Sequence, residues 1–269
     1  MAQSILNRTP PPADDRVSYG DDALHFADLR MPPGEDPHPG AIGIHGGFWR
    51  NRYGLDHFGH VCAALTARGL ATWNIEYRRI GDAGGGWPGT FNDVAAAANH
   101  LFDHAARLNI DPARVVVIGH SAGGHLASWL ASMANVPEES PIRAEALDLR
   151  GAISLAGLLD LRMTWAQGLG SGAVVELLGG PPDDVPDRYD AASPFTLAPS
   201  PVPHVVVHGS DDVLVPARMS ARYRTEASKL GADVELLTLR NASHFDVIDP
   251  ESSVWPEIAD AVLGLIDAH

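Results

Sequence analysis

Short apolar runs alternate along this chain with longer segments in which apolar residues recur every three or four positions. The short runs are mostly aliphatic and are bounded by glycine, proline or charged residues, which is typical of buried strands. They lie at residues 41–45, 71–76, 115–119, 151–155, 204–208 and 234–239. An earlier, half-exposed pair of strands is expected near residues 17–19 and 23–29.

The longer segments predict five helices, at residues 56–68, 92–108, 122–134, 216–230 and 255–268. Gly69 and Gly231 each follow a helix at a normal C-terminal stop, and Pro216 stands in the first turn of another. Thr90 or Asn92 is expected to cap the second helix. Strands that alternate with helices in this way predict an α/β fold, in which a mostly parallel sheet carries helices on both faces.

Residues 156–203 interrupt this alternation with short apolar pieces among many glycines and prolines. The segment is too long for a simple connection, so it is predicted to be an insertion with its own short helices that forms a partial lid over a pocket. The 269 residues then form one domain. Its parts are an N-terminal tail (1–16), an α/β core (17–155 and 204–269) and the lid insertion (156–203).

The formal net charge is −15, from 34 acidic and 19 basic residues. Such a surface repels phosphate, which argues against a nucleic-acid or anionic-membrane partner. The single cysteine, Cys62, excludes a disulfide within the chain, and a buried thiol is expected. The first residues lack the apolar core of a signal peptide, and no stretch reaches the ~18 apolar residues of a membrane span. A cytoplasmic protein is therefore expected, and a homodimer is left open.

The segment GHSAGG at residues 119–124 follows a predicted strand and opens a predicted helix. A serine at such a sharp turn adopts strained backbone angles, and the flanking glycines let the chain pass without side-chain clashes. The hydroxyl of Ser121 is then presented above the sheet, at the positive end of the helix. Ser121 is therefore the candidate nucleophile, whereas His120 is expected to point elsewhere and His125 to pack on the helix.

A serine hydroxyl needs a base within hydrogen-bond reach, and the base needs an acid that fixes its tautomer. His244 follows the last predicted strand, and Asp212 follows the strand before it. The resulting order of serine, aspartate and histidine is the one expected when all three side chains meet above such a sheet. Asp211 competes with Asp212 for the role of the acid, and Asp160 at another strand end is a further alternative.

The segment HGGFW at residues 45–49 directly follows the first buried strand. Two adjacent glycines allow a chain to turn its backbone amides toward a developing negative charge, which such amides stabilise well. The amides of Gly47, Phe48 and Ala122 are therefore expected to form an oxyanion hole.

Two histidine pairs have the spacing of metal ligands on a helix, His57 with His60 and His100 with His104. Neither pair is accompanied by a third ligand, and no cofactor-binding motif is present. Neither a metal nor a cofactor is expected.

The pairing of HGGFW at 45–49 with GHSAGGHLA at 119–127 resembles the kynurenine formamidase (arylformamidase) branch of the α/β hydrolases. It is also similar to the neighbouring carboxylesterases of the hormone-sensitive lipase group. Those esterases usually carry a third glycine where this chain has Phe48, so the aromatic pair Phe48 and Trp49 looks more like the formamidase branch. Further similar pieces are YRRI at 77–80, LAGLLDL at 155–161, Ala192-Ser193-Pro194 and HFDVI at 244–248. The resemblance spans roughly residues 40–250.

The resemblance implies the α/β-hydrolase fold and a serine hydrolase that cleaves a small carboxylic ester or an aryl formamide through an acyl-enzyme. The aromatic residues expected to line the substrate pocket are Trp49, Trp165 and Phe245, together with Phe48. The same triad also serves peptidases and thioesterases, and a catalytically silent fold that only binds ligands is an alternative of another class. No propeller-like repeat region that would admit peptides is present, and no triad member is missing. A small-molecule ester or amide is therefore the expected substrate.

Overall fold

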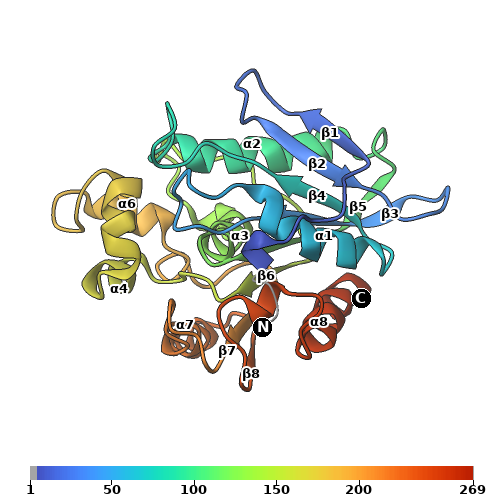
Figure 1. The fold of residues 1–269 in the computed structure, drawn as a ribbon. Coiled ribbons are helices and arrows are strands. Elements are labelled where there is room, and N and C mark those ends of the chain that lie inside the picture. The colour runs from blue at the N-terminus through green and yellow to red at the C-terminus, as the bar shows by residue number, and fades with distance from the viewer. Residues whose placement is uncertain (1–4, 269) are drawn as a thin grey trace.

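The computed structural model describes residues 5–268, and an eight-stranded sheet lies at its centre (Figure 1). The strands are β1 (Asp15–Ser18), β2 (Phe26–Arg30), β3 (His38–Ile44), β4 (Ala71–Ile75), β5 (Ile110–His120), β6 (Gly151–Leu155), β7 (His204–Gly209) and β8 (Val234–Leu239). Their order is β1-β2-β4-β3-β5-β6-β7-β8. Only the pairs β1–β2 and β2–β4 are antiparallel, so the predicted α/β fold with a mostly parallel sheet is confirmed.

Successive residues of the central strands point to opposite faces of the sheet. Because the residues on both faces are apolar, helices cover both faces. The longer helices are α1 (Gly59–Thr66), α2 (Gly89–Asp103), α3 (Ala122–Ala131), α7 (Arg218–Lys229) and α8 (Trp255–Asp267). In β5, Val115 and Val117 pack into the core beneath α2 and α3. Val116 and Ile118 pack into the opposite core beneath α1 and α8. The continuous apolar run in β5 is thus explained by burial on both sides.

Several helix boundaries differ from those predicted. The helix predicted at 92–108 begins at Gly89 and ends at Asp103, and neither Thr90 nor Asn92 is its N-cap. Thr90 lies inside α2, where its hydroxyl donates to the carbonyl oxygen of Arg78. The helix predicted at 56–68 is divided into the 3-10 turn η2 (Leu55–Phe58) and α1. The helix predicted from Pro216 begins two residues later as α7.

The predicted insertion contains short helices, which gather beyond one side of the sheet (yellow in Figure 1). They are α4 (Leu161–Ala166), η4 (Leu169–Gly172), α5 (Ala173–Leu178) and α6 (Pro186–Ala192). That this segment forms a partial lid over a pocket stays a prediction. The described part of the N-terminal tail is packed against the core, and its 3-10 turn η1 (Ile5–Asn7) buries Ile5.

The sequence also led to expectations about the single cysteine and about membrane-spanning helices. Cys62 is buried in the core beneath α1, and burial raises the pKa of its thiol to about 12. The thiol is therefore held in its unreactive, protonated form. Within residues 5–268, every helix is too short or too polar to cross a bilayer.

Candidate active site

Ser121 occupies the sharp turn between β5 and α3 with φ 54° and ψ −117°, angles that non-glycine residues rarely adopt. Close backbone packing fixes this turn. A Cβ atom on Gly119 would lie 2.1 Å from the carbonyl oxygen of Gly123, and one on Gly123 would lie 2.1 Å from that of Ile44. The backbone amide of Ser121 donates to the carbonyl oxygen of Leu155 at 2.8 Å. The strain is therefore held by the surrounding sheet, and the side chain is presented at its carboxyl edge.

Asp212 and His244 lie on the loops that follow β7 and β8, and their side chains are joined. The Nδ1 atom of His244 lies 2.6 Å from the Oδ2 atom of Asp212. Burial opposes ionisation of Asp212, but hydrogen bonds from His208 and His244, together with the charge of His244, hold its pKa well below the ordinary value. A carboxylate that only accepts fixes the proton of His244 on Nδ1, which leaves Nε2 free to act as a base.

Asp212 is itself held rigidly. Its Oδ1 atom accepts hydrogen bonds from the amides of Leu214 at 2.8 Å and Val215 at 2.9 Å. The Nε2 atom of the buried His208 lies 3.2 Å from Oδ2, and Ser220 lies 2.7 Å from the other ring nitrogen of His208. No pattern in the sequence pointed to this histidine.

The alternative acids lie elsewhere. Asp211 accepts a hydrogen bond from the hydroxyl of its neighbour Ser210 and is exposed. Asp160 caps α4 through the amide of Met163 and pairs with Arg222. The structure therefore brings Asp212, and neither alternative, to His244.

Ser121 and His244 line one cavity of about 210 Å³ at the carboxyl edge of the sheet. The other residues that line it are Leu6, Gly47, Phe48, Tyr53, His57, His120, Leu214 and Phe245. The cavity is mainly apolar, and its aromatic walls come from three separate segments. Such a volume accommodates a small organic group rather than a polymer chain.

The HGGFW segment forms the loop that faces Ser121. Gly47, Phe48 and Trp49 have φ values of 121°, 51° and 57°, so three successive residues lie in the left-handed half of conformational space. The amides of Gly47 and Phe48 have no acceptor among residues 5–268. Ala122 opens α3, where first-turn amides lack a partner within the helix. Successive free amides of this kind can cradle a negative charge.

A buried ion pair anchors this loop to the sheet. The two ring nitrogens of His45 each lie 2.9 Å from an oxygen, one on the carbonyl of Gly46 and one on the carboxylate of Glu76. Burial opposes ionisation of Glu76, but the charge and hydrogen bond of His45 and the charge of Arg79 lower its pKa. The Tyr77 hydroxyl also donates to the carbonyl oxygen of His45 at 2.8 Å.

Two of the aromatic residues expected at the pocket do not line this cavity. Trp49 is fully buried in the core, and its indole donates to the Nδ1 atom of His125 at 3.1 Å. Trp165 is 41% exposed on α4. Trp49 therefore supports the loop from behind, and only Phe48 and Phe245 of the predicted aromatic residues reach the cavity.

His120 and His125 have closer contacts with the site than the sequence indicated. The ring of His120 lies 4.6 Å from that of His244, and its Nε2 atom donates to the backbone oxygen of His244 at 2.9 Å. The expectation that His120 points elsewhere was wrong, because the turn directs it toward the histidine loop. The Nε2 atom of His125 donates to the carbonyl oxygen of Ala192 at 2.8 Å, so it links Trp49 on the loop to the insertion.

The insertion rests directly on the same loop. The Phe48 ring packs so tightly on Gly170 that a Cβ atom there would lie 2.3 Å from the ring. Arg50 makes a bidentate ion pair with Glu176 on α5, at 3.0 and 2.6 Å. The position of Phe48, and hence of its amide, depends on the fit of the insertion.

The histidine pairs that sequence spacing singled out are used otherwise. His57 lines the cavity, whereas the rings of His100 and His104 stack on each other at 4.2 Å. Within the described residues, no group of three histidine, cysteine, aspartate or glutamate side chains could hold a metal ion.

Comparison with known proteins places this fold and site in a family. Residues 27–226 match the BD-FAE family, which covers most of the chain. The chain belongs to the BD-FAE family. BD-FAE proteins are α/β-hydrolase esterases, so the predicted superfamily is confirmed. The esterase LipC of Mycobacterium tuberculosis is 26% identical over 87% of this BD-FAE chain and 60% of its own length. The chain spans 55% to 62% of the length of the first curated relatives it matches.

Solved structures share the fold of this BD-FAE chain. A truncated carbohydrate esterase from gut microbiota superposes with a TM-score of 0.82 at 21% identity, and covers 99% of this chain and 100% of its own. The esterase 2 of Thermogutta terrifontis, phosphonylated by sarin, superposes with a TM-score of 0.76 at 23% identity, covering 97% and 98%. The predicted α/β-hydrolase fold is therefore confirmed by these structures together with the family match.

The contact between Gly170 and Phe48 predicts a selective effect of Gly170→Ala. The new methyl group would displace the Phe48 ring and its amide, so kcat for an activated ester should fall by about tenfold or more. Gly168→Ala is the matched control, because Gly168 has nearly the same φ, 62° against 60°, and nothing lies within 4 Å of its Cβ position. Steady-state kinetics would measure kcat of both variants, and thermal unfolding would verify that both remain folded. An equal loss of kcat in both variants would assign the effect to backbone strain alone.

Buried histidines around the site predict that acid destabilises the fold. Burial, and then the charge of His45, lower the pKa of His57 to about 3, and burial lowers that of His125 to about 4. Both have a pKa near 6.5 in an unfolded chain, so the unfolded state binds more protons as pH falls from 7 toward 4, and stability is lost in that window. Each histidine accounts for about 2 kcal/mol of unfolding free energy between pH 7 and 5.

Urea unfolding at pH 7, 6 and 5 would measure this loss. The variant His125→Gln should lose about 2 kcal/mol less than the wild type over the same interval, because one of the titrating groups is gone. An identical pH dependence in the two proteins would contradict the burial argument.

Proposed function

We propose that this chain hydrolyses a small carboxylic ester through an acyl-enzyme, with Ser121 as nucleophile, His244 as base and Asp212 as the acid that orients it. The observation that carries the proposal is the 2.6 Å contact between His244 and Asp212 beside the cavity that Ser121 also lines. In the sequence, Ser121 lies 91 residues before Asp212 and 123 residues before His244. The strained backbone of Ser121 and the free amides of Gly47 and Phe48 support the same proposal.

The chemistry follows from the positions of the protons. The Nε2 atom of His244 takes the hydroxyl proton as the oxygen of Ser121 attacks the carbonyl carbon of the substrate. The resulting oxyanion is stabilised by the amides of Gly47, Phe48 and Ala122. His244 then gives its proton to the leaving alcohol as the ester bond breaks. Water repeats the sequence on the acyl-enzyme, which releases the acid and restores Ser121.

The size and lining of the cavity favour a short ester. A volume of about 210 Å³ leaves room for an acyl group of a few carbon atoms and a modest alcohol. Structures of Thermogutta terrifontis esterase 2 with bound propionate and butyrate support short acyl groups for a protein of the same fold. The small-molecule substrate belongs to this proposal, and the cytoplasmic location and the homodimer stay predictions.

An aryl formamide is the second candidate substrate. The aromatic side chains of Phe48, Tyr53 and Phe245 line the cavity and would accept a flat aromatic leaving group on either substrate. Most of the curated relatives, however, are named as esterases, which favours the ester, and one is named as an uncharacterized peptidase.

Parallel assays of phenyl acetate and N-formylkynurenine would separate the two candidates. The ester proposal expects kcat/KM for phenyl acetate to exceed that for N-formylkynurenine by about a hundredfold or more, because substrates are distinguished through transition-state binding. Comparable or faster deformylation would replace the ester with the formamide.

Removal of the nucleophile tests the mechanism. Ser121→Ala should lower turnover of phenyl acetate by about 10⁴-fold or more, and His244→Ala by a similar factor. The double variant should lose little beyond either single one, because the residues act as a unit. Ser228→Ala, an exposed serine on α7, is the control and should keep wild-type activity. Substantial activity in folded Ser121→Ala would end the proposal.

A further inference from the structure

The N-terminal segment closes one wall of the active-site cavity. Leu6, in η1, lines the cavity together with Ser121 and His244, although it lies more than a hundred residues before either. Its neighbour Ile5 is 2% exposed and is anchored in the core beneath α1 and α8. Leu6 packs partly against the same core. The leucine is therefore held in place by a buried anchor directly beside it.

Polar contacts fix the chain immediately after Leu6. Arg8 pairs with Asp249, and its Nη1 atom lies 2.7 Å from Glu251. These acids follow the turn η5 (Asp246–Ile248), which comes directly after His244 and Phe245. The carbonyl oxygen of Arg8 also lies 3.3 Å from a ring nitrogen of His60 on α1. The segment thus bridges the histidine loop and α1 beside the cavity that Leu6 lines.

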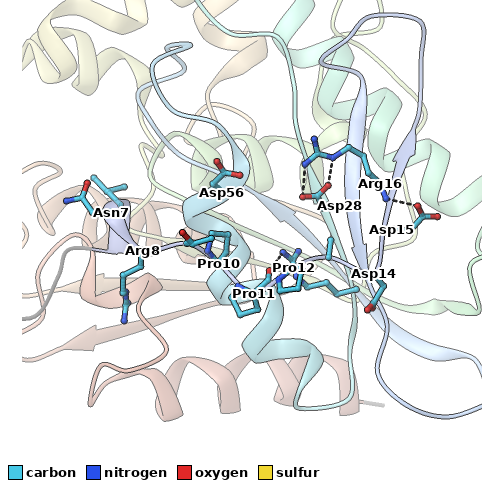
Figure 2. Close-up of a pocket in the computed structure, with 14 residues that line it drawn as sticks. Asn7, Arg8, Pro10, Pro11, Pro12, Asp14, Asp15, Arg16, Asp28 and Asp56 are labelled. Atoms are coloured by element: carbon cyan, nitrogen blue, oxygen red, sulfur yellow. Dashed lines mark hydrogen bonds and ion pairs between the residues drawn. The ribbon is translucent and has the colours of Figure 1, made fainter.

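Three prolines continue the same segment, which we call the strap (residues 5–12). Pro10 packs against Gly59 at the start of α1, where a Cβ atom would lie 2.9 Å from the proline ring. Figure 2 shows the labelled prolines running from Arg8 toward Asp14 and the first strand. Arg30 donates to the carbonyl oxygen of Pro11 at 2.9 Å. Proline restricts the backbone, so ordering this strap costs little conformational entropy.

We propose that Leu6 sets the upper size limit of the substrate group that enters the cavity, and that the strap is a specificity-determining wall of the active site. This proposal rests on the proposed esterase function. It adds the substrate class, which is esters whose acyl or alcohol chain is short on the side that faces Leu6. The wall is a single side chain on a fixed backbone, and Leu6→Ala would remove most of that side chain without touching Ser121, His244 or the oxyanion loop.

The test compares Leu6→Ala and Leu6→Phe with the wild type on two series of esters. One series varies the acyl chain as p-nitrophenyl acetate, butyrate, hexanoate and octanoate, and the other varies the alcohol as methyl, butyl and hexyl acetate. In one of the two series, Leu6→Ala should raise the ratio of kcat/KM for the six-carbon ester to that for the shortest ester by about tenfold or more. The reason is that burying each additional methylene group of the substrate changes kcat/KM by roughly fourfold. Leu6→Phe should change the same ratio in the opposite direction.

The control is Leu230→Ala, which makes the same chemical change at an exposed leucine, 59% accessible, at the end of α7. Thermal unfolding of each variant verifies that the fold is kept. The role of Leu6 would be overturned if, in both series, the Leu6 variants kept a ratio of kcat/KM between long and short esters within twofold of that of Leu230→Ala. The esterase proposal would still stand in that case, provided that the wild type hydrolyses the shortest ester. A wild type that hydrolyses no ester of either series would overturn both.

Discussion

The hydrogen bond between His244 and the buried carboxylate of Asp212 is the constraint on which the site depends. It requires a charged group to stay ionised with almost no water around it, which is costly unless hydrogen bonds replace the lost solvation. Those bonds come from two backbone amides and from His208 as well as from His244 itself. The loop after β7 is therefore shaped around one carboxylate, and the orientation of His244 follows from it.

Backbone packing at the carboxyl edge of the sheet supplies the rest of the alignment. The two glycines around Ser121 allow β5, α3 and the end of β3 to approach within distances that any side chain would prevent. This approach places the loop after β3 beside Ser121, and the buried pair of His45 and Glu76 fixes the start of the loop. The strain at Ser121, Phe48 and Trp49 is thus balanced by the surrounding core, as the proposed oxyanion site would require.

The grouping of Ser121, Asp212 and His244 could be predicted from the sequence because each follows a buried strand, and parallel strands bring their carboxyl ends together. The binding surface could not be predicted in the same way. Trp49 is aromatic and adjacent to the oxyanion loop, yet its left-handed backbone turns the indole into the core toward His125. Leu6 and His57 reach the cavity through tertiary packing of segments that have no periodic relation to the motifs. Helix ends were misplaced where a side chain such as Thr90 found a tertiary partner instead of a cap.

The molecule thus has two parts, the strand ends that carry the triad residues and the loops that bound the cavity. The ends of the strands carry the groups that we propose to be catalytic. The cavity is bounded by the strap, by the loop that carries Tyr53 and His57, and by the segment after Asp212 that carries Leu214. Phe48 belongs to both parts, since it lies in the loop after β3 and lines the cavity, and its ring also packs on the insertion at Gly170. A change in the strap should therefore alter which ester enters without altering the chemistry, whereas a change in the insertion should affect the rate itself. Variation of loops on a constant sheet is how one fold serves many substrates.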